Sequence, residues 1–263
     1  MEVDKNLAKY KINRDNFSNN SGKLISFNKD LISILQDRGK PTKLQSELTT
    51  TKIKKPRGIS LNNEQIKHIK LSLILINRFL VPKLATIITG SRDSTDASYL
   101  GRGLFLSKYY LNKKNPKILT SIILHEGAHI LFARQVRIDN REYTGSLLKL
   151  FKEIKFQETA IYGKYDVHKS PLFKVFDESE YCRELPGVAG HPHDSADELQ
   201  ASATSVIFLF QKEFENKVNK LKPKQKKQAL TIARHIARFY LSNDKCPRNL
   251  FSTEFLQFVG LQK

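Results

Sequence analysis

The sequence predicts an α+β protein that is mainly helical, with a small edge-strand sheet that comes before its most distinctive helix. Apolar residues recur every three or four positions in several long segments, which indicates amphipathic helices. Two shorter segments, 84–89 and 97–107, flank a turn-prone stretch and are expected to form neighbouring strands. With 263 residues, of which 40% are hydrophobic, the chain can bury a core, so a wholly disordered protein is excluded.

Three regions are expected along the chain. Residues 1–23 are polar and show no apolar period, which predicts a disordered arm. Residues 24–58 are expected to hold a short helix at 28–36, stopped by a glycine and a proline, and then a basic linker. Residues 59–263 are expected to form a single folded domain.

Four helices are expected within this domain. Their apolar periods place them at 62 to just before Pro82, about 115–136, about 196–217 and about 224–241. The second begins at Asn115 and Pro116, because asparagine is a good N-cap and proline is favoured at the first helical position. Between 137 and 190 the pattern is irregular and predicts short helical pieces and loops.

The second strand segment contains Gly101 and Gly103. These residues weaken a central strand but suit the edge of a sheet, where another backbone approaches closely. A bulge or a tight bend would use the same glycines, so both interpretations stay open.

The chain is strongly basic. Its net charge of +19, from 45 Lys and Arg against 26 Asp and Glu, favours contact with polyanions. The lysine-rich runs at 52–57 and 217–227 have no interleaved aromatic residues on which bases could stack. We therefore interpret them first as solvated surfaces and keep nonspecific nucleic-acid contact as a second hypothesis.

Signals for export and for membrane insertion are not seen in the sequence. Residues 1–17 lack the apolar run of a secretory signal peptide, which leaves the cytoplasm and export by a signal-independent route open. The most apolar window, 71–88, contains charged residues and a proline, so no membrane span is expected. The two cysteines, Cys182 and Cys246, leave a single disulfide open.

The residues with the most informative chemistry are His125-Glu126-Gly127-Ala128-His129 in the apolar helix at 115–136. Residues four apart lie on one face of a helix, so both imidazoles can reach a single ion, and Glu126 is placed to hold a metal-bound water. The alternative is a pair of satisfied core histidines. This H-E-x-x-H spacing predicts a metal-dependent hydrolase.

A catalytic zinc usually has three protein ligands, so a third must come from elsewhere. A metzincin would continue with a glycine and a histidine at the positions held here by Phe132 and Gln135, which excludes that class. The best candidate is Glu198, near the start of the next strong helix. Three alternatives remain: Glu198 could instead complete a capping box with Ser195, Asp194 or Asp197 could be the ligand, or one of His191 and His193 could be.

This arrangement resembles the gluzincin-type zinc metalloproteases, and residues 99–210 in part resemble the lethal-factor-like peptidases. The resemblance implies a zincin-like metallopeptidase domain at 59–263 with Zn²⁺ held by His125, His129 and Glu198. It also implies an endopeptidase in which Glu126 is the general base and an edge strand pairs with the peptide or protein substrate.

The donor that stabilises the oxyanion differs from the family pattern. Lethal-factor-like enzymes have a tyrosine seven residues before the glutamate ligand, and here that position is His191. We expect His191 or His193 to supply the donor, with three tyrosines as less favoured alternatives, Tyr162, Tyr165 and Tyr181. Thermolysin-like enzymes have an acid four residues after the ligand, where this chain has Ser202, so an aspartate or a backbone carbonyl is expected to orient the imidazoles.

Other classes of function were weighed against the protease. One is a nucleic-acid-binding protein with a structural metal, or a protease that acts on DNA-bound partners, which the net charge favours. Another is an inactive zincin fold that serves as an interaction module, which the intact Glu126 disfavours. A secreted toxin or effector protease would share the chemistry and differ in target and delivery.

Overall fold

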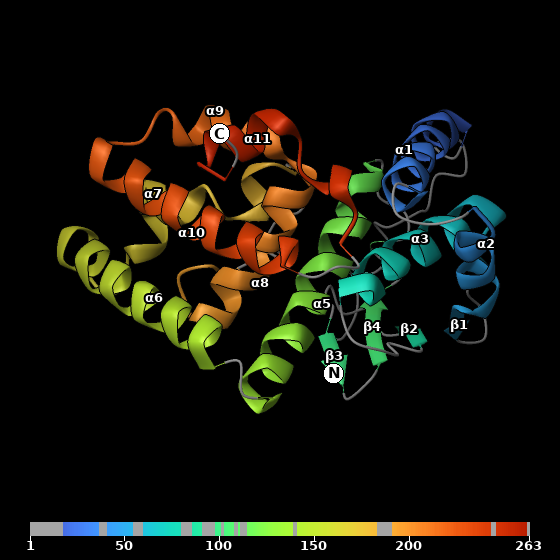
Figure 1. Ribbon diagram of the computed structural model, residues 1–263, viewed down its shortest axis with the longest axis horizontal. Coiled ribbons are helices and arrows are strands. Elements are labelled where there is room, and N and C mark those ends of the chain that lie inside the picture. The colour runs from blue at the N-terminus through green and yellow to red at the C-terminus, as the bar shows by residue number, and fades with distance from the viewer. Residues whose placement is uncertain are drawn as a thin grey trace, which may run out of the picture.

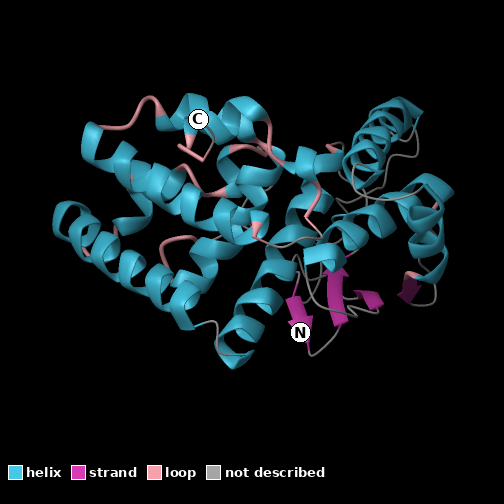
Figure 2. Ribbon diagram, viewed as in Figure 1, coloured by secondary structure: helices cyan, strands magenta, loops and turns pink. Residues whose placement is uncertain are grey.

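We analysed a computed structural model of the chain. It describes residues 18–36, 41–54, 60–79, 86–90, 98–100, 103–107, 110, 115–138, 141–182, 191–242 and 246–261. This part of the chain is predominantly helical, as Figure 2 shows, which confirms the mainly helical prediction.

The elements follow one another along the chain as shown in Figure 1. The longer helices are α1 (Ser18–Gln36), α2 (Pro41–Thr50), α3 (Asn63–Phe79), α5 (Pro116–Ile138), α6 (Arg141–Tyr162), α8 (Ala196–Leu209), α9 (Gln211–Val218) and α10 (Pro223–Leu241). The short helical pieces are η3 (Val167–Lys169), α7 (Pro171–Lys174), η4 (Glu178–Glu180), η5 (Arg248–Leu250) and α11 (Thr253–Phe258). The strands are β1 (Lys52–Lys54), β2 (Thr86–Gly90), β3 (Ser98–Leu100) and β4 (Gly103–Ser107).

The four strands pair in the order β1-β2-β4-β3. β2 is parallel to both β1 and β4, with Ile87 opposite Leu104, and β3 is antiparallel to β4 at the edge of the sheet. β3 and β4 contact α5, and β1 contacts α3. The strand expected at 84–89 begins at Thr86. The single strand expected at 97–107 is instead two antiparallel strands, β3 and β4, and Gly103 lies on β4, which pairs on both sides and is not the edge of the sheet. Residues 84–85, 97 and 101–102 lie outside the described part.

Helix α5 is the central element of the structure. It packs along α8 and also contacts α3 and α6. Its apolar residues cover its whole circumference rather than one stripe, which is typical of a helix buried on all sides. Asn115 caps it by accepting from the backbone of Lys117 at 3.0 Å, and Pro116 opens it, so the expected start at Asn115-Pro116 is confirmed. The site residues are therefore carried on a rigid, buried helix.

Within the first 58 residues, the helix expected at 28–36 is confirmed as the second part of α1, whereas the arm and the linker were wrong where the structure describes them. Helix α1 begins at Ser18, inside the expected arm, and α2 and β1 occupy most of the expected basic linker. Isolated leucines fix these elements: Leu35 of α1 and Leu44 of α2 are buried. Arg78 of α3 then ties them together by donating to the Leu35 carbonyl and, at 2.9 Å, to Glu47. Residues 1–17 lie outside the described part.

Helix α6 also contradicts the prediction, because it spans 22 residues where short pieces and loops were expected. Its buried stripe consists of Leu147, Phe151, Ile154 and Glu158. The carboxylate of Glu158 can be buried because it accepts hydrogen bonds from Ser170 at 2.5 Å and from Gln225 at 2.9 Å. A charged residue at a core position interrupts the apolar period, and this is why the sequence pattern looked irregular.

The remaining helices agree more closely with the sequence. The predicted helices from 62 and at 224–241 are confirmed as α3 and α10. The helix expected at 196–217 is divided at Phe210, whose φ of −132° and ψ of 34° are not helical. The ring of Phe210 stacks on Tyr181, with centroids 5.2 Å apart. A single-residue break of this kind leaves the apolar period almost unchanged.

The described residues show whether the two cysteines are bonded and whether a helix could span a membrane. Cys182 and Cys246 are both buried and are not bonded to each other. Among the described helices, none has a stretch long and apolar enough to cross a bilayer.

The close contact between α5 and α3 depends on Gly127. A Cβ atom at this position would lie 2.6 Å from Cδ1 and 2.9 Å from Cγ2 of Ile76, which is itself buried. We expect Gly127→Ala to lower the free energy of unfolding by about 1–3 kcal/mol, measured by denaturant titration, because the core has no room for the methyl group.

Gly145 offers a matched control within α6. An added Cβ there would meet nothing within 4 Å, so Gly145→Ala should raise the free energy of unfolding by about 0.5–1 kcal/mol. Parental stability of Gly127→Ala would show that the contact with Ile76 does not limit the packing of α5.

Candidate metal centre

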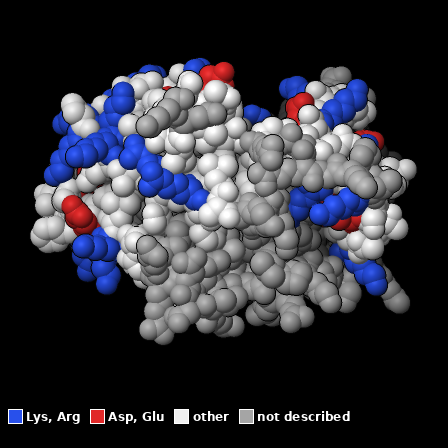
Figure 3. All heavy atoms as spheres, in the orientation of Figure 1, with Lys and Arg blue, Asp and Glu red and all other residues white. Residues whose placement is uncertain are grey.

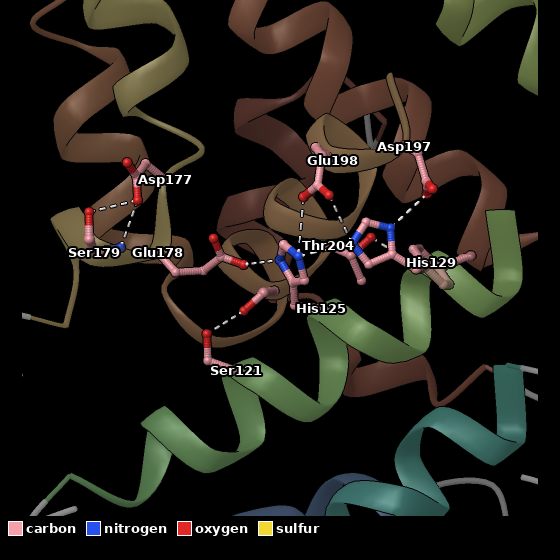
Figure 4. Close-up of polar contacts among 11 residues, drawn as sticks. Ser121, His125, His129, Asp177, Glu178, Ser179, Asp197, Glu198 and Thr204 are labelled. Atoms are coloured by element: carbon pink, nitrogen blue, oxygen red, sulfur yellow. Dashed lines mark hydrogen bonds and ion pairs between the residues drawn. The ribbon is translucent and has the colours of Figure 1, made fainter. Parts of the chain in front are cut away.

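His125 and His129 lie one turn apart on α5, and both rings face α8 (Figure 4). The ring centroids are 4.8 Å apart and the planes are inclined by 76°. The two Nε2 atoms approach to 3.1 Å. The spacing predicted from the sequence thus brings the same nitrogen atom of each imidazole to one point.

Glu198 reaches this point from the first turn of α8. Its carboxylate oxygens lie 3.4 Å from Nε2 of His125 and 3.5 Å from Nε2 of His129. One ligand atom from each of these three residues falls within 4.8 Å of the others. Ser195 is the N-cap and accepts from the backbone N–H of Glu198 at 3.1 Å, while the carboxylate faces the histidines. The capping residue and the metal-binding carboxylate are therefore compatible.

A carboxylate stands behind each imidazole. Nδ1 of His125 is 2.8 Å from Oε1 of Glu178, and Nδ1 of His129 is 2.9 Å from Oδ1 of Asp197. Since a neutral imidazole has one N–H, a proton on Nδ1 leaves the lone pair on Nε2. Metal-binding histidines commonly have such a carboxylate behind them.

The donor set therefore fits a cation. Two Nε2 lone pairs and a carboxylate converge on one small volume, and acceptors at these distances repel one another unless protons or a positive ion lie between them. Two imidazoles and one carboxylate are a usual set for a catalytic zinc, which keeps a further position for water or substrate.

The carboxylates also set the charge of the histidines in the metal-free protein. Burial alone would lower the pKa of both, but Glu178 raises the pKa of His125 to about 10, and Asp197 with Glu198 raises the pKa of His129 to about 9. Burial raises the pKa of Glu198, yet its contacts with both imidazoles hold it well below its usual range. A divalent ion can thus replace two protons without changing the net charge of the site.

Glu126 is half-buried beside this group. Burial raises the pKa of its carboxyl above the usual value, although the charges of His125 and His129 partly oppose the shift. A carboxylate with a raised pKa takes up a proton more readily than a solvated one, which suits the role predicted for Glu126.

The expected oxyanion donors have contacts of their own. His193 lies 3.3 Å from Asp194 and its ring packs against Phe173, while His191 is exposed. Both precede α8, and their catalytic role stays a prediction. The hydroxyl of Tyr181 donates to the carbonyl of Val175 at 2.6 Å, so this less favoured donor is already engaged.

Glu178 is the site residue that the sequence analysis did not identify. It is buried on η4, which Asp177 caps by accepting from the backbone of Ser179 at 2.9 Å. The sequence feature that could have indicated Glu178 is a run of three acids within residues 177–180 of a basic chain. The sequence allows Asp197 as a ligand or as an acid that orients an imidazole, and the structure places it in the second position, at Nδ1 of His129. Ser202 is buried, and its hydroxyl has no hydrogen-bond partner among the described residues.

Comparison of the chain with known protein families, curated proteins and solved structures found no match in any of the three. The resemblance to gluzincins therefore stays a prediction from the motif residues. The interpretation of the site depends on its own geometry.

We expect Glu178→Gln to weaken zinc binding by about 10-fold, because glutamine keeps the shape but loses the charge that orients and polarises His125. Affinity would be measured by competition with a chromophoric chelator. Glu180→Gln is the matched control, since Glu180 lies on the same short helix and pairs instead with Lys217 at 3.1 Å. An equal loss in both variants would contradict a specific role for Glu178.

Binding of a divalent ion should release protons. The raised pKa values mean that both imidazoles are protonated near neutral pH, and protons must leave before a metal can bind. At about pH 7 we expect roughly two protons per ion, and an affinity that rises with pH until the pH passes about 10, the pKa of His125. Calorimetry in buffers of different ionisation enthalpy measures this number, and no release would show that the histidines are already neutral.

Proposed function

We propose that this chain is a zinc-dependent endopeptidase that hydrolyses a peptide bond. The observation that carries the proposal is the convergence of His125, His129 and Glu198, each imidazole backed by a carboxylate, next to a half-buried Glu126. Two imidazoles and a carboxylate fit Zn²⁺ better than the oxygen-seeking ions Mg²⁺ or Ca²⁺.

In this proposal His125, His129 and Glu198 hold the ion, while Glu178 and Asp197 fix the orientation of the two rings. A zinc ion held there would lower the pKa of a water molecule and polarise a carbonyl group. Glu126 accepts the proton of the attacking water on its carboxylate and passes it to the leaving amine. Its raised pKa lets it hold that proton between the two steps.

An extended substrate would lie along the edge of the sheet. β3 forms that edge and contacts α5, so a peptide paired with its backbone would run beside the helix that carries Glu126. His191 or His193, which precede α8, would stabilise the tetrahedral oxyanion. The zincin-like identity of the domain belongs to this proposal.

Two rival functions make different demands on the same residues. A structural zinc is held by four protein ligands as a rule, whereas three converge in the described part of the chain. An inactive zincin-like interaction module would have no need of the half-buried carboxylate of Glu126 next to its metal ligands. A nucleic-acid-associated protein remains the alternative that the charge of +19 favours.

The deciding experiment replaces the general base alone. Glu126→Gln should retain zinc but cleave a mixed peptide library at least about 100-fold more slowly, because the amide cannot take up a proton. Mass spectrometry follows the products and elemental analysis the metal. Glu213→Gln, an exposed substitution of the same kind on α9, should match the parent. A zinc-loaded Glu126→Gln variant with parental activity would refute the role of Glu126.

The same preparation tests the ligand set. His129→Ala and Glu198→Ala should each lose the zinc that the parent retains, because two remaining ligands bind an ion weakly. Retention of zinc by both variants would place the metal elsewhere. Absence of zinc from a folded parent that also fails to bind added zinc would overturn the proposal.

A further inference from the structure

Exposed apolar side chains are most frequent on α6 and the turn that follows it. Of the six large apolar side chains that are exposed in the described part, four belong to α6 and the turn after it: Leu148, Phe156, Ile161 and Tyr165. Phe156, Ile161 and Tyr165 are 78%, 66% and 86% exposed. Scattered exposed apolar residues are normal, but a group this exposed marks an interaction surface.

Lysines surround the same end of α6. Gln228 and Gln225 of α10 donate to Gln157 and Glu158 of α6 at 2.9 Å, so the two helices run antiparallel there. The end of α6 thus lies beside the start of α10, at the left of Figure 1. The exposed lysines near these two helix ends are Lys164, Lys220, Lys222, Lys224 and Lys227. Figure 3 shows basic side chains gathered over this region.

Acidic groups do little to offset these lysines. Asp166 is already paired with Lys169 at 2.8 Å, and the carboxylate of Glu158 is buried, which leaves Glu153 as an exposed acid on α6. From residue 217 to residue 227 the chain has six lysines and no acid. We name the surface formed by Phe156, Ile161, Tyr165 and the exposed lysines of 220–227 the α6–α10 end.

We propose that the α6–α10 end docks the protein on an anionic lipid bilayer. The lysines are attracted to acidic headgroups, and the apolar side chains enter the interfacial region, so the surface supplies the two signals that stable peripheral binding needs. This proposal does not depend on the metal site, since neither His125 nor Glu198 belongs to the surface.

The composition of the surface favours a bilayer over other occupants. Nucleic-acid platforms use aromatic rings on which bases stack, and Phe156 and Tyr165 have such rings, but Ile161 is aliphatic and offers no such face. A second copy of the chain in a two-fold interface would bring the same lysines against one another, and like charges oppose that contact. An anionic bilayer satisfies both the charge and the aliphatic side chains.

Sedimentation with lipid vesicles tests the proposal on the full chain. The parent should bind vesicles of phosphatidylcholine mixed with phosphatidylserine and not vesicles of phosphatidylcholine alone. Two variants remove one signal each: Phe156→Ser with Ile161→Ser, and Lys222→Gln with Lys224→Gln and Lys227→Gln. Each should lower partitioning by at least about 10-fold, with circular dichroism and thermal unfolding confirming the fold.

A charge-matched control uses exposed lysines of α1 and α2, which lie far from α6 in Figure 1. Lys23→Gln with Lys29→Gln and Lys43→Gln should partition as the parent does. The proposal is overturned if the parent fails to bind acidic vesicles or if the control loses as much as the lysine variant. It is also overturned if an oligonucleotide binds this surface, as judged by loss in the same variants, while acidic vesicles do not.

Discussion

Two imidazole nitrogens held 3.1 Å apart are the constraint on which the rest of the site depends. Because Glu178 and Asp197 face Nδ1 of the two rings, the Nε2 atoms point at each other and at Glu198, and they offer lone pairs once their protons have left. Acceptors in this arrangement are stable only with positive charge between them. The carboxylates of Glu178, Asp197 and Glu198 raise the pKa values of both histidines and so keep positive charge at this point. The position of α8 brings Asp197 and Glu198 to the two rings.

Close packing around α5 makes this arrangement possible. Gly127 lets α3 approach the helix on one side, while small residues of α8 face it on the other, with Ser121 and Ser205 bonded at 2.6 Å. His68, buried on α3, lies 3.1 Å from the carbonyl of Pro116, where α5 begins, and holds that helix end in place. Burial lowers the pKa of His68 to about 4, so it remains neutral where His125 and His129 are charged. His68 on α3 thus differs in charge from the two histidines on α5 because the surroundings of their rings differ.

The sequence predicted the parts of the fold and site that local patterns encode. The period of α3 and α10, the capped start of α5 and the i, i+4 spacing of His125 and His129 are all local, and each was placed correctly. What escaped prediction depends on contacts between distant residues. Glu158 can occupy a buried position of α6 only because Ser170 and Gln225 donate hydrogen bonds to its carboxylate. Glu178 contacts His125 only after η4 has packed on α5 and α8.

The metal centre is assembled from segments that leave the ribosome at different times. His125 and His129 are made first, then Glu178, and the pair Asp197 and Glu198 last. An incomplete chain that ends before α8 has the imidazoles without the third ligand or the support of Asp197. Under the function proposed above, metal capture is thereby coupled to completion of the helical core, and a nascent or truncated chain lacks a complete hydrolytic centre.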